Sequence, residues 1–165
     1  MAVTGKNKKK KQREAASGDV ATNRRARHRF KVLERFECGI VLQGSEVKSL
    51  RDGKASLNEA YAVVEEGEVW LRGLHIPPYL PASTQNHDPD RSRKLLMHRG
   101  EIERLIGKTA EKGMTLVPLR VYFKGSLAKV ELGLATNKEG RDRRREIADR
   151  DVRREIERDY KQRLN

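Results

Sequence analysis

Residues 114–135 read MTLVPLRVYFKGSLAKVELGLA, and this stretch decides which class of fold the chain adopts. On both sides of Lys124-Gly125-Ser126, apolar and polar residues alternate, which is typical of two half-buried strands joined by a tight turn. The positions expected to share a face are Val117, Leu119, Val121 and Phe123 before the turn, and Ala128, Val130, Leu132 and Leu134 after it. The stretch therefore predicts an antiparallel hairpin.

Upstream segments show the same alternation. Residues 29–43 predict a long half-buried strand, in which Gly39 indicates a bulge or a bend. Residues 61–64 and 69–76 predict a second hairpin across a turn at 65–68. Five or six antiparallel strands in sequential hairpins favour a mainly β fold, a small closed or nearly closed barrel, because closure leaves no long exposed strand edge.

The segment GSEVKSLR (44–51) predicts a short helix between two strands. Ser45 is the expected N-cap, Glu46 favours the first turn, and Gly53 stands where a helix often ends in a glycine. The signals at both ends make this a complete helix in spite of its length.

A second helix is expected over residues 91–108, with an interruption at Gly100. Its predicted inward residues are Leu95, Leu96, Ile102, Leu105 and Ile106. The preceding residues 77–91 hold four of the five prolines, so they predict a long loop that leads into this helix.

Positive charge gathers at the two ends of the chain. Residues 1–29 hold 10 basic and 2 acidic side chains, residues 30–135 hold 16 and 14, and residues 136–165 hold 11 and 8. We therefore expect a disordered basic arm over 1–21, a folded domain over 22–135, and a basic tail that continues from residue 136 to the end.

The formal net charge of +13 is an electrostatic footprint for a polyanion. Nucleic acid is the usual partner of such a protein, and an acidic membrane surface is the other candidate. No apolar run approaches the roughly 20 residues that a membrane-spanning helix needs, so we expect no membrane partner. One cysteine, Cys38, cannot form an internal disulfide, and the basic N-terminus lacks the apolar core of a secretory signal. The expected compartment is the cytoplasm.

The tail from residue 142 onward predicts a helix of low intrinsic stability. Pairs of an acid and a base at i, i+4 each add roughly 0.2–0.5 kcal/mol to a helix. These pairs are Glu146–Arg150, Asp149–Arg153, Glu157–Lys161 and Asp159–Arg163. The apolar stripe is thin and consists of Val152, Ile156, Tyr160 and Leu164. We expect the tail to order fully as a helix on a partner.

Catalytic chemistry has little support. Glu46 and Lys48 have the spacing of the metal-and-base pair of one class of nuclease, which makes a metal-dependent nuclease one alternative function. That chemistry needs a second acid upstream, and Glu37 is the nearest on a predicted strand. The four histidines show no metal-ligand spacing with one another or with Cys38. We expect no enzyme activity, no metal site and no cofactor.

Two basic motifs favour RNA binding. TNRRARHRF (22–30) lies directly before the first long strand, and RSRK (91–94) lies at the expected start of a helix, whose dipole attracts anions. The candidate contacts are Arg24, Arg25, Arg27, His28, Arg93 and Lys94. Guanidinium groups bind phosphates and stack on bases. Only 5% of the residues are aromatic, so structured RNA is favoured over extended single strands.

Four long segments in order carry a resemblance to a known family. They are NRRARHRF, FECGIVLQGSEVKSLRDGKASLNEAY, HDPDRSRKLLMHRGEIERL and LVPLRVYFKGSLAKVELGLA. From about Thr22 to Ala135, the chain resembles the SsrA-binding protein (SmpB) family. The resemblance implies an OB-like barrel of six antiparallel strands, with short helices packed on it and a C-terminal tail that is helical when bound.

The resemblance also implies a function in ribosome rescue. Family members bind the tRNA-like domain of transfer-messenger RNA (tmRNA) and deliver it to stalled ribosomes for trans-translation. Elongation factor Tu with GTP takes part through the RNA, and the tail senses the vacant mRNA channel beside the decoding centre. A general structured-RNA or ribosome-associated module without tagging activity is the alternative.

The family's site residues carry over position by position. Its RNA contacts match Asn23, Arg25, His28, Glu37, Leu96 and Lys129. Glu46 and Lys48 belong to a family motif that is structural and RNA-facing. The expected decoding-centre contacts are Lys138, Arg141, Asp142, Arg143 and Arg144. Asn137, Glu139 and Arg141 depart from the usual glycine, lysine and aromatic or histidine, which is what suggests the alternative without tagging.

Overall fold

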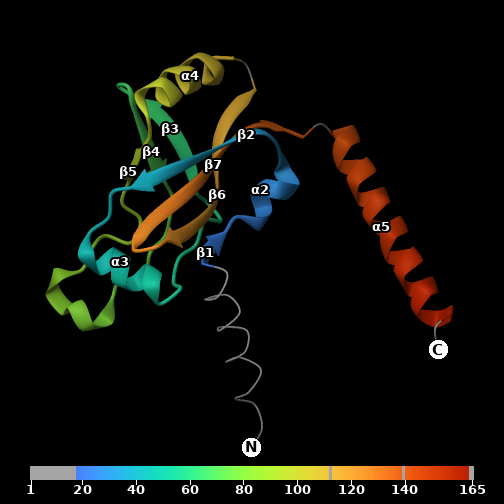
Figure 1. Cartoon of the computed structure of the whole chain (residues 1–165), viewed down its shortest axis with the longest axis horizontal. Coiled ribbons are helices and arrows are strands. Elements are labelled where there is room, and N and C mark those ends of the chain that lie inside the picture. The colour runs from blue at the N-terminus through green and yellow to red at the C-terminus, as the bar shows by residue number, and fades with distance from the viewer. Residues whose placement is uncertain (1–17, 112, 139, 164–165) are drawn as a thin grey trace, which may run out of the picture.

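The computed structural model describes residues 18–111, 113–138 and 140–163 (Figure 1). Its strands are β1 (Asp19–Thr22), β2 (Phe30–Ile40), β3 (Tyr61–Glu65), β4 (Glu68–Arg72), β5 (Arg93–Leu96), β6 (Met114–Lys124) and β7 (Leu127–Asn137). Its helices are α2 (Arg24–Arg29), α3 (Gly44–Arg51), α4 (Arg99–Thr109) and α5 (Gly140–Arg163), with a 3-10 helix η1 (Leu80–Gln85). The arm expected to be disordered lies almost wholly outside the described residues.

The strands close into a barrel. They follow the order β1-β6-β3-β4-β5-β2-β7, and β6 also pairs with β7, so six antiparallel strands form a ring while β1 adds to the outside of β6. The seam between β3 and β6 is thin, with Ala62 opposite Leu116 as its one paired position among the described residues. The prediction of a small six-stranded antiparallel barrel is confirmed.

The predicted hairpin is the longest element of this barrel. Strands β6 and β7 pair from Lys124 opposite Leu127 back to Met114 opposite Thr136. A bulge between Pro118 and Arg120 reverses which side of β6 faces inward. Before it, Leu116 belongs to the main core while Val117 and Leu119 pack in a smaller cluster with Ala26; after it, Val121 returns to the main core. The prediction of one shared face along β6 is therefore wrong, whereas the face predicted for β7 is confirmed at Val130, Leu132 and Leu134.

Strand β2 is shorter than predicted and bulges elsewhere. The register shifts between Val32 and Glu34, not at Gly39, which pairs regularly with Leu96 of β5 and Lys129 of β7. A Cβ atom at Gly39 would lie 3.2 Å from Cβ of Leu96. The glycine is thus explained by the close approach of Leu96, and the predicted bulge at this position is wrong.

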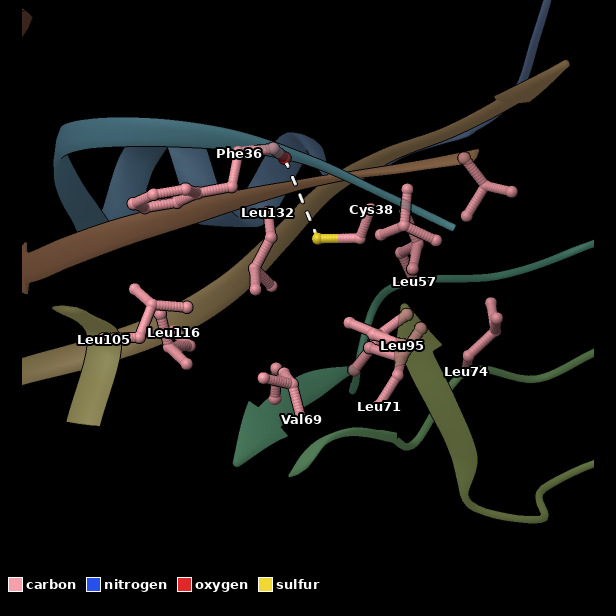
Figure 2. Packing of buried hydrophobic residues seen from close by; sticks show 14 of the residues in the cluster. Phe36, Cys38, Leu57, Val69, Leu71, Leu74, Leu95, Leu105, Leu116 and Leu132 are labelled. Atoms are coloured by element: carbon pink, nitrogen blue, oxygen red, sulfur yellow. Dashed lines mark hydrogen bonds between the residues drawn. The ribbon is translucent and has the colours of Figure 1, made fainter. Parts of the chain in front are cut away.

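The main core fills the inside of the barrel. Figure 2 shows side chains from the strands and from α4 directed into one interior. Labelled members include Phe36, Cys38, Leu71, Leu95, Leu105 and Leu132. Burial raises the pKa of the Cys38 thiol to about 12, so this cysteine is a core residue and not a nucleophile.

The segment predicted as one interrupted helix contains a strand and a shorter helix. Arg93 and Leu95 point inward and Lys94 and Leu96 point outward along β5, which lies between β4 and β2. Helix α4 begins only at Arg99. The helical prediction failed here because a fully buried arginine occupies an interior position of the strand, where alternation is expected to place an apolar residue. Leu96 and Ile106, predicted inward, are 51% and 44% exposed.

Two elements near the N-terminus were not predicted. Strand β1 pairs with β6, so folded structure begins before residue 22. Helix α2 follows at once, with Asn23 as its N-cap. Asn23 accepts a hydrogen bond from the Ala26 amide and donates to the Pro118 carbonyl at 3.0 Å. A buried asparagine thereby fixes a short basic helix to the outside of β6.

The helix predicted at residues 44–51 is confirmed as α3. It ends before Gly53, whose φ of +73° is the left-handed conformation expected after a helix. The N-cap is Gln43 and not Ser45. The Ser45 hydroxyl instead hydrogen-bonds Nδ1 of the buried His87, which ties the first turn of α3 to the proline-rich loop.

A buried ionic cluster joins α3 to β5. Oε1 of Glu46 accepts hydrogen bonds from Nε of Arg91 and Nε of Arg93, each at 2.8 Å, and Oε2 accepts from Nη2 of Arg91 and from the Gln43 amide. Arg93 also donates to the carbonyls of Leu74 and Pro89. The side chains of Glu46 and Arg93 are both 0% exposed. The cluster therefore holds α3, β5 and both ends of the 77–91 loop together.

Glu46→Ala will destabilise the fold by about 3–5 kcal/mol, because it leaves a buried arginine without its counter-charge. Urea unfolding followed by circular dichroism measures this loss. Glu65→Ala, which breaks an exposed ion pair with Arg72, is the matched control and will cost about 1 kcal/mol or less. Equal losses in the two variants would contradict the structural role of Glu46.

The same carboxylate makes stability depend on pH. Burial by itself would raise the pKa of Glu46, but hydrogen bonds from Arg91, Gln43 and Arg93 outweigh it, so the pKa lies below the ordinary value of 4.5. A lowered folded-state pKa gives stability that is complete above the unfolded-state pKa and is lost as the pH falls through the folded-state pKa.

Unfolding free energies measured between pH 6 and pH 3 (about the span of a carboxylate titration) test this dependence. The wild-type protein will lose stability more steeply below about pH 4.5 than Glu46→Gln, which has no titrating group at this position. Parallel curves for the two proteins would show that Glu46 does not contribute to the acid lability.

Candidate nucleic-acid interface

Helix α2 displays the first basic motif. The side chains of Arg24, Arg25, Arg27 and His28 are exposed. Asn23, in contrast, is 3% exposed, and both polar atoms of its amide are used within the protein. The prediction that Asn23 contacts RNA directly is therefore wrong for this structure, and we assign it the role of positioning the four exposed residues.

Three further predicted contacts meet on one outer face of the barrel. Gly39 of β2 lies between Leu96 of β5 and Lys129 of β7, and Glu37 lies two residues before Gly39 on the same face. Antiparallel pairing thus brings together residues 37, 96 and 129, which are far apart in the sequence. Side chains at i and i+2 of a strand share a face, so Glu37, Leu96 and Lys129 form one surface. We call it the Glu37 face.

Glu37 is held as an ionised acceptor. It accepts hydrogen bonds from the Tyr122 hydroxyl and from Nζ of Lys124, the latter at 3.1 Å. These two bonds, with that from Tyr122 the larger influence, lower the pKa of Glu37 below its ordinary value. Burial and then the bond to Glu37 raise the pKa of Tyr122 to about 12. The carboxylate is 43% exposed, so it can still accept a bond from a ligand.

An apolar groove borders the Glu37 face. It has a volume of about 270 Å³ and is lined by Val47, Leu96, Leu127 and Lys129, among others. Leu96 and Leu127 are 51% and 62% exposed. Exposed apolar side chains beside a cation suit the flat face and the phosphate of a nucleotide.

The sequence analysis did not predict Tyr122 and Arg120, which lie beside Glu37 on the same side of the barrel. The Arg120 guanidinium lies 4.3 Å from the centroid of the Tyr122 ring and pairs with Asp19 and Glu131. Tyr122 stands opposite Lys129 across the β6–β7 ladder. Pairing the two predicted strands residue by residue from their turn would have found this neighbour.

The second basic motif is mostly structural. Arg93 and Glu46 are inside the protein, so the prediction that they contact RNA is wrong. Lys94 lies on the outer side of β5, where its Nζ is 2.5 Å from Oε1 of Glu68. The helix start expected here is absent, and with it the helix dipole. Lys48 remains exposed, 5.7 Å from the Tyr79 ring centroid.

The nuclease interpretation of Glu46 and Lys48 is also wrong. The Glu46 carboxylate is buried and its oxygens are occupied by two arginines and a backbone amide. It cannot bind a metal ion that substrate must reach. Among the described residues, no group of three or more His, Cys, Asp or Glu side chains could hold a metal ion. No helix in the described part of the chain is long and apolar enough to cross a membrane.

The tail begins at Lys138, which is held by hydrogen bonds to two helices. Nζ of Lys138 donates to the Arg27 carbonyl at 2.8 Å and to Glu146 at 2.6 Å, and its backbone amide donates to the Arg29 carbonyl. Its side chain is only 9% exposed. Lys138 in this conformation therefore joins α2 to α5, and its contact with the decoding centre stays a prediction.

Helix α5 extends away from the barrel (Figure 1). It runs over 24 residues, and Val152, Ile156 and Tyr160 of its apolar stripe are 54–66% exposed. Arg144 is exposed; the side chains of Arg141, Asp142 and Arg143, and all of Leu164, lie outside what the structure describes. The helix is confirmed, and its further ordering on a partner stays a prediction.

The model of the SmpB family, described as "SmpB protein", matches residues 20–162. The chain belongs to the SmpB family. It is 57% identical over 145 residues to the SsrA-binding protein of Pelotomaculum thermopropionicum, and this alignment covers 88% of this chain and 95% of that protein. It is 58% identical over 139 residues to the SsrA-binding protein of Saccharopolyspora erythraea, and that alignment covers 84% of this chain and 88% of that protein.

A solved SmpB structure also has this fold. It is named "tmRNA-SmpB: a journey to the center of the bacterial ribosome" and superposes with a TM-score of 0.62 at 52% identity, over 72% of this chain and 84% of that one. The resemblance noticed in the four sequence segments is thus confirmed for the family and for the barrel. The SmpB family match extends beyond the barrel into α5, which the four segments did not cover.

Proposed function

We propose that the protein is an RNA-binding adaptor of trans-translation. It binds the tRNA-like domain of tmRNA and delivers it to stalled ribosomes, where the tail senses the vacant mRNA channel. The observation that carries the proposal is the similarity to the tmRNA–SmpB ribosome structure at 52% identity. Elongation factor Tu with GTP would join through the RNA, and the work would take place in the cytoplasm.

The arrangement of charges supports RNA binding by two adjoining surfaces. Arg24, Arg27 and Arg29 of α2 are exposed and have no acidic partner among the described residues, which suits phosphate binding. On the Glu37 face, an ionised acceptor, an exposed leucine and Lys129 offer three different kinds of contact to a folded RNA. Phosphate contacts position a partner, and an acceptor such as Glu37 can discriminate.

The composition of the tail supports the proposed role in sensing the vacant mRNA channel. Residues 139–165 hold 10 basic and 8 acidic side chains, a mixture that can line an RNA channel without strong nonspecific attraction. Lys138, Arg141, Asp142, Arg143 and Arg144 are the proposed decoding-centre contacts. Lys138 would have to exchange the Arg27 carbonyl and Glu146 for ribosomal RNA.

The ion pair between Lys138 and Glu146 favours a second candidate function. This is a structured-RNA or ribosome-associated module without tagging activity. Glu146 competes with phosphate for Lys138, and Glu139 replaces a lysine usual in the family. A tagging assay separates the two candidates, because both bind RNA and only the adaptor supports peptide tagging.

A chain that ends at Lys138 will bind the tRNA-like domain within about threefold of the full chain, because only two net positive charges are removed. It will not support tagging in a reconstituted translation reaction. The cut belongs after residue 138, not at the predicted boundary of 136, since β7 runs to Asn137 and the Lys138 amide bonds the Arg29 carbonyl. An RNA affinity that drops more than about tenfold would contradict this division of labour.

Glu37→Arg will weaken binding to the tRNA-like domain about tenfold although it adds positive charge, because a charge-assisted acceptor is lost. Glu65→Arg is the matched control, since it makes the same charge change at a carboxylate that is 47% exposed against 43% for Glu37. Fluorescence anisotropy with labelled RNA gives both affinities. If Glu37→Arg tightened binding as the control does, Glu37 would not be a contact.

A further inference from the structure

Strand β1 presents a side chain on the same outer surface as the Glu37 face. Asp19 of β1 stands opposite Tyr122 of β6, which stands opposite Lys129 of β7. Lys129 in turn stands opposite Gly39 of β2, whose other neighbour is Leu96 of β5. Directly paired residues point to the same side of a sheet. Although β1 lies outside the barrel ring, Asp19 therefore belongs to a row of residues that ends on the Glu37 face.

A second row lies beside the first and contains two acids. Glu131 of β7 stands opposite Glu37 of β2, and like charges at directly opposed positions repel. Arg120 of β6 offsets this repulsion, because its Nε lies 3.1 Å from Oε2 of Glu131. Arg35 is a second partner of Glu131, at 3.7 Å. Nη1 of Arg120 also lies 2.9 Å from Oδ1 of Asp19, so one guanidinium connects β1 to β7.

Tyr122 joins the two rows. Its hydroxyl donates to Glu37, and the Arg120 guanidinium lies 4.3 Å from the centroid of its ring. Because Asp19 and Glu131 hold Arg120 from two sides, the stacked guanidinium limits where the ring of Tyr122 can lie. A continuous series of contacts thus runs from Asp19 through Arg120 and Tyr122 to Glu37.

Lys129 shows why the position of the Glu37 carboxylate matters. It is a diagonal neighbour of Glu37 across β2 and β7, within reach of a long side chain. Yet it has no acidic partner among the described residues, because Tyr122 and Lys124 hold the carboxylate. A Glu37 side chain released from them would be free to pair with Lys129. The surface would then offer an RNA neither an acceptor nor a cation.

We propose that Tyr122 and Arg120 are positioning residues for RNA recognition, and that Asp19 of β1 is the outer end of the same series of contacts. They act through Glu37, by keeping its carboxylate apart from Lys129 so that both remain available to the RNA. The inference rests on the proposed binding of the tRNA-like domain. It makes β1 part of the recognition surface, although this strand is not needed to close the barrel.

The first test needs no RNA. An NMR titration of the full chain gives the pKa of the Glu37 carboxyl, which the hydrogen bond from Tyr122, and next that from Lys124, hold below the ordinary value of 4.5. Tyr122→Phe will raise this pKa toward 4.5, because the hydroxyl donor is lost. Asp19→Asn will raise it by a smaller amount, although the loss of a nearby negative charge would by itself lower it. An unchanged Glu37 pKa in both variants would overturn the inference.

The second test is the affinity for tRNA-like-domain RNA, measured by fluorescence anisotropy. Tyr122→Phe keeps the net charge and will weaken binding about fivefold. Asp19→Asn removes an acid, which by itself favours RNA, and will nevertheless weaken binding about threefold. Asp90→Asn is the matched control, since it removes the aspartate of another surface ion pair, that with His75. This control will not weaken binding.

Dependence on Glu37 distinguishes positioning from a general loss of structure. In a Glu37→Ala background, Tyr122→Phe and Asp19→Asn will each change the affinity by less than about 1.5-fold, because the residue through which they act is absent. Thermal unfolding of each variant checks that the fold is kept. Undiminished weakening in that background would overturn the inference, as would an Asp19→Asn protein that binds RNA more tightly than wild type.

The proposed function and this inference fail in different ways. A wild-type protein without preference for the tRNA-like domain over an ordinary tRNA would contradict the proposed function. A wild-type protein with that preference, whose Glu37 pKa and RNA affinity do not respond to Tyr122→Phe, would contradict the inference alone.

Discussion

The buried ion pair between Glu46 and Arg93 is the interaction on which the rest of the structure depends. A carboxylate and a guanidinium, both without solvent contact, are held by each other and by surrounding hydrogen bonds. Such a pair contributes little net stability compared with apolar residues, but removing either partner is costly. Glu46 of α3 therefore supplies the counter-charge for Arg93 at the position where β5 lies between β4 and β2. Leu96 on β5 and Lys48 on α3 take their positions from this pair.

Closure of the barrel then explains how residues from distant parts of the chain come to share a surface. The β2 strand is flanked by β5 on one side and β7 on the other, so Gly39 has Leu96 and Lys129 as direct neighbours. Because Gly39 lacks a side chain, Leu96 can approach closely and stay exposed at the edge of the apolar groove. Asn23 likewise sets the position of its neighbours, because it fixes α2 to β6. In both places a residue with no exposed side chain of its own determines which neighbouring side chains are presented at the surface.

Much of this fold could be predicted from periodicity. The β6–β7 hairpin, β2 and α3 follow alternation or capping signals that depend on local sequence. Strand β5 could not be predicted in this way, because Arg93 looks like a surface residue until its partner, 47 positions earlier, is known. The basic motif RSRK predicts Arg93 as an RNA contact and the family motif predicts Glu46 as one, but the two residues bind each other inside the protein. The resemblance names Glu37, Leu96 and Lys129 as RNA contacts, and only the strand pairing shows that they share one exposed face. It does not distinguish positioning residues such as Asn23 from residues that face solvent.

We propose that a shaped barrel surface, and not the basic ends of the chain, selects the RNA. The most direct test is the affinity of the full chain for the tRNA-like domain of tmRNA, an ordinary tRNA and a plain RNA duplex, each at a low and a high salt concentration. Electrostatic attraction to phosphates falls steeply with salt and is shared by all three RNAs. A preference for the tRNA-like domain that persists at high salt is the predicted result. Equal affinities for the three RNAs that fall together as salt rises would instead show that the basic ends of the chain bind RNA without selecting it.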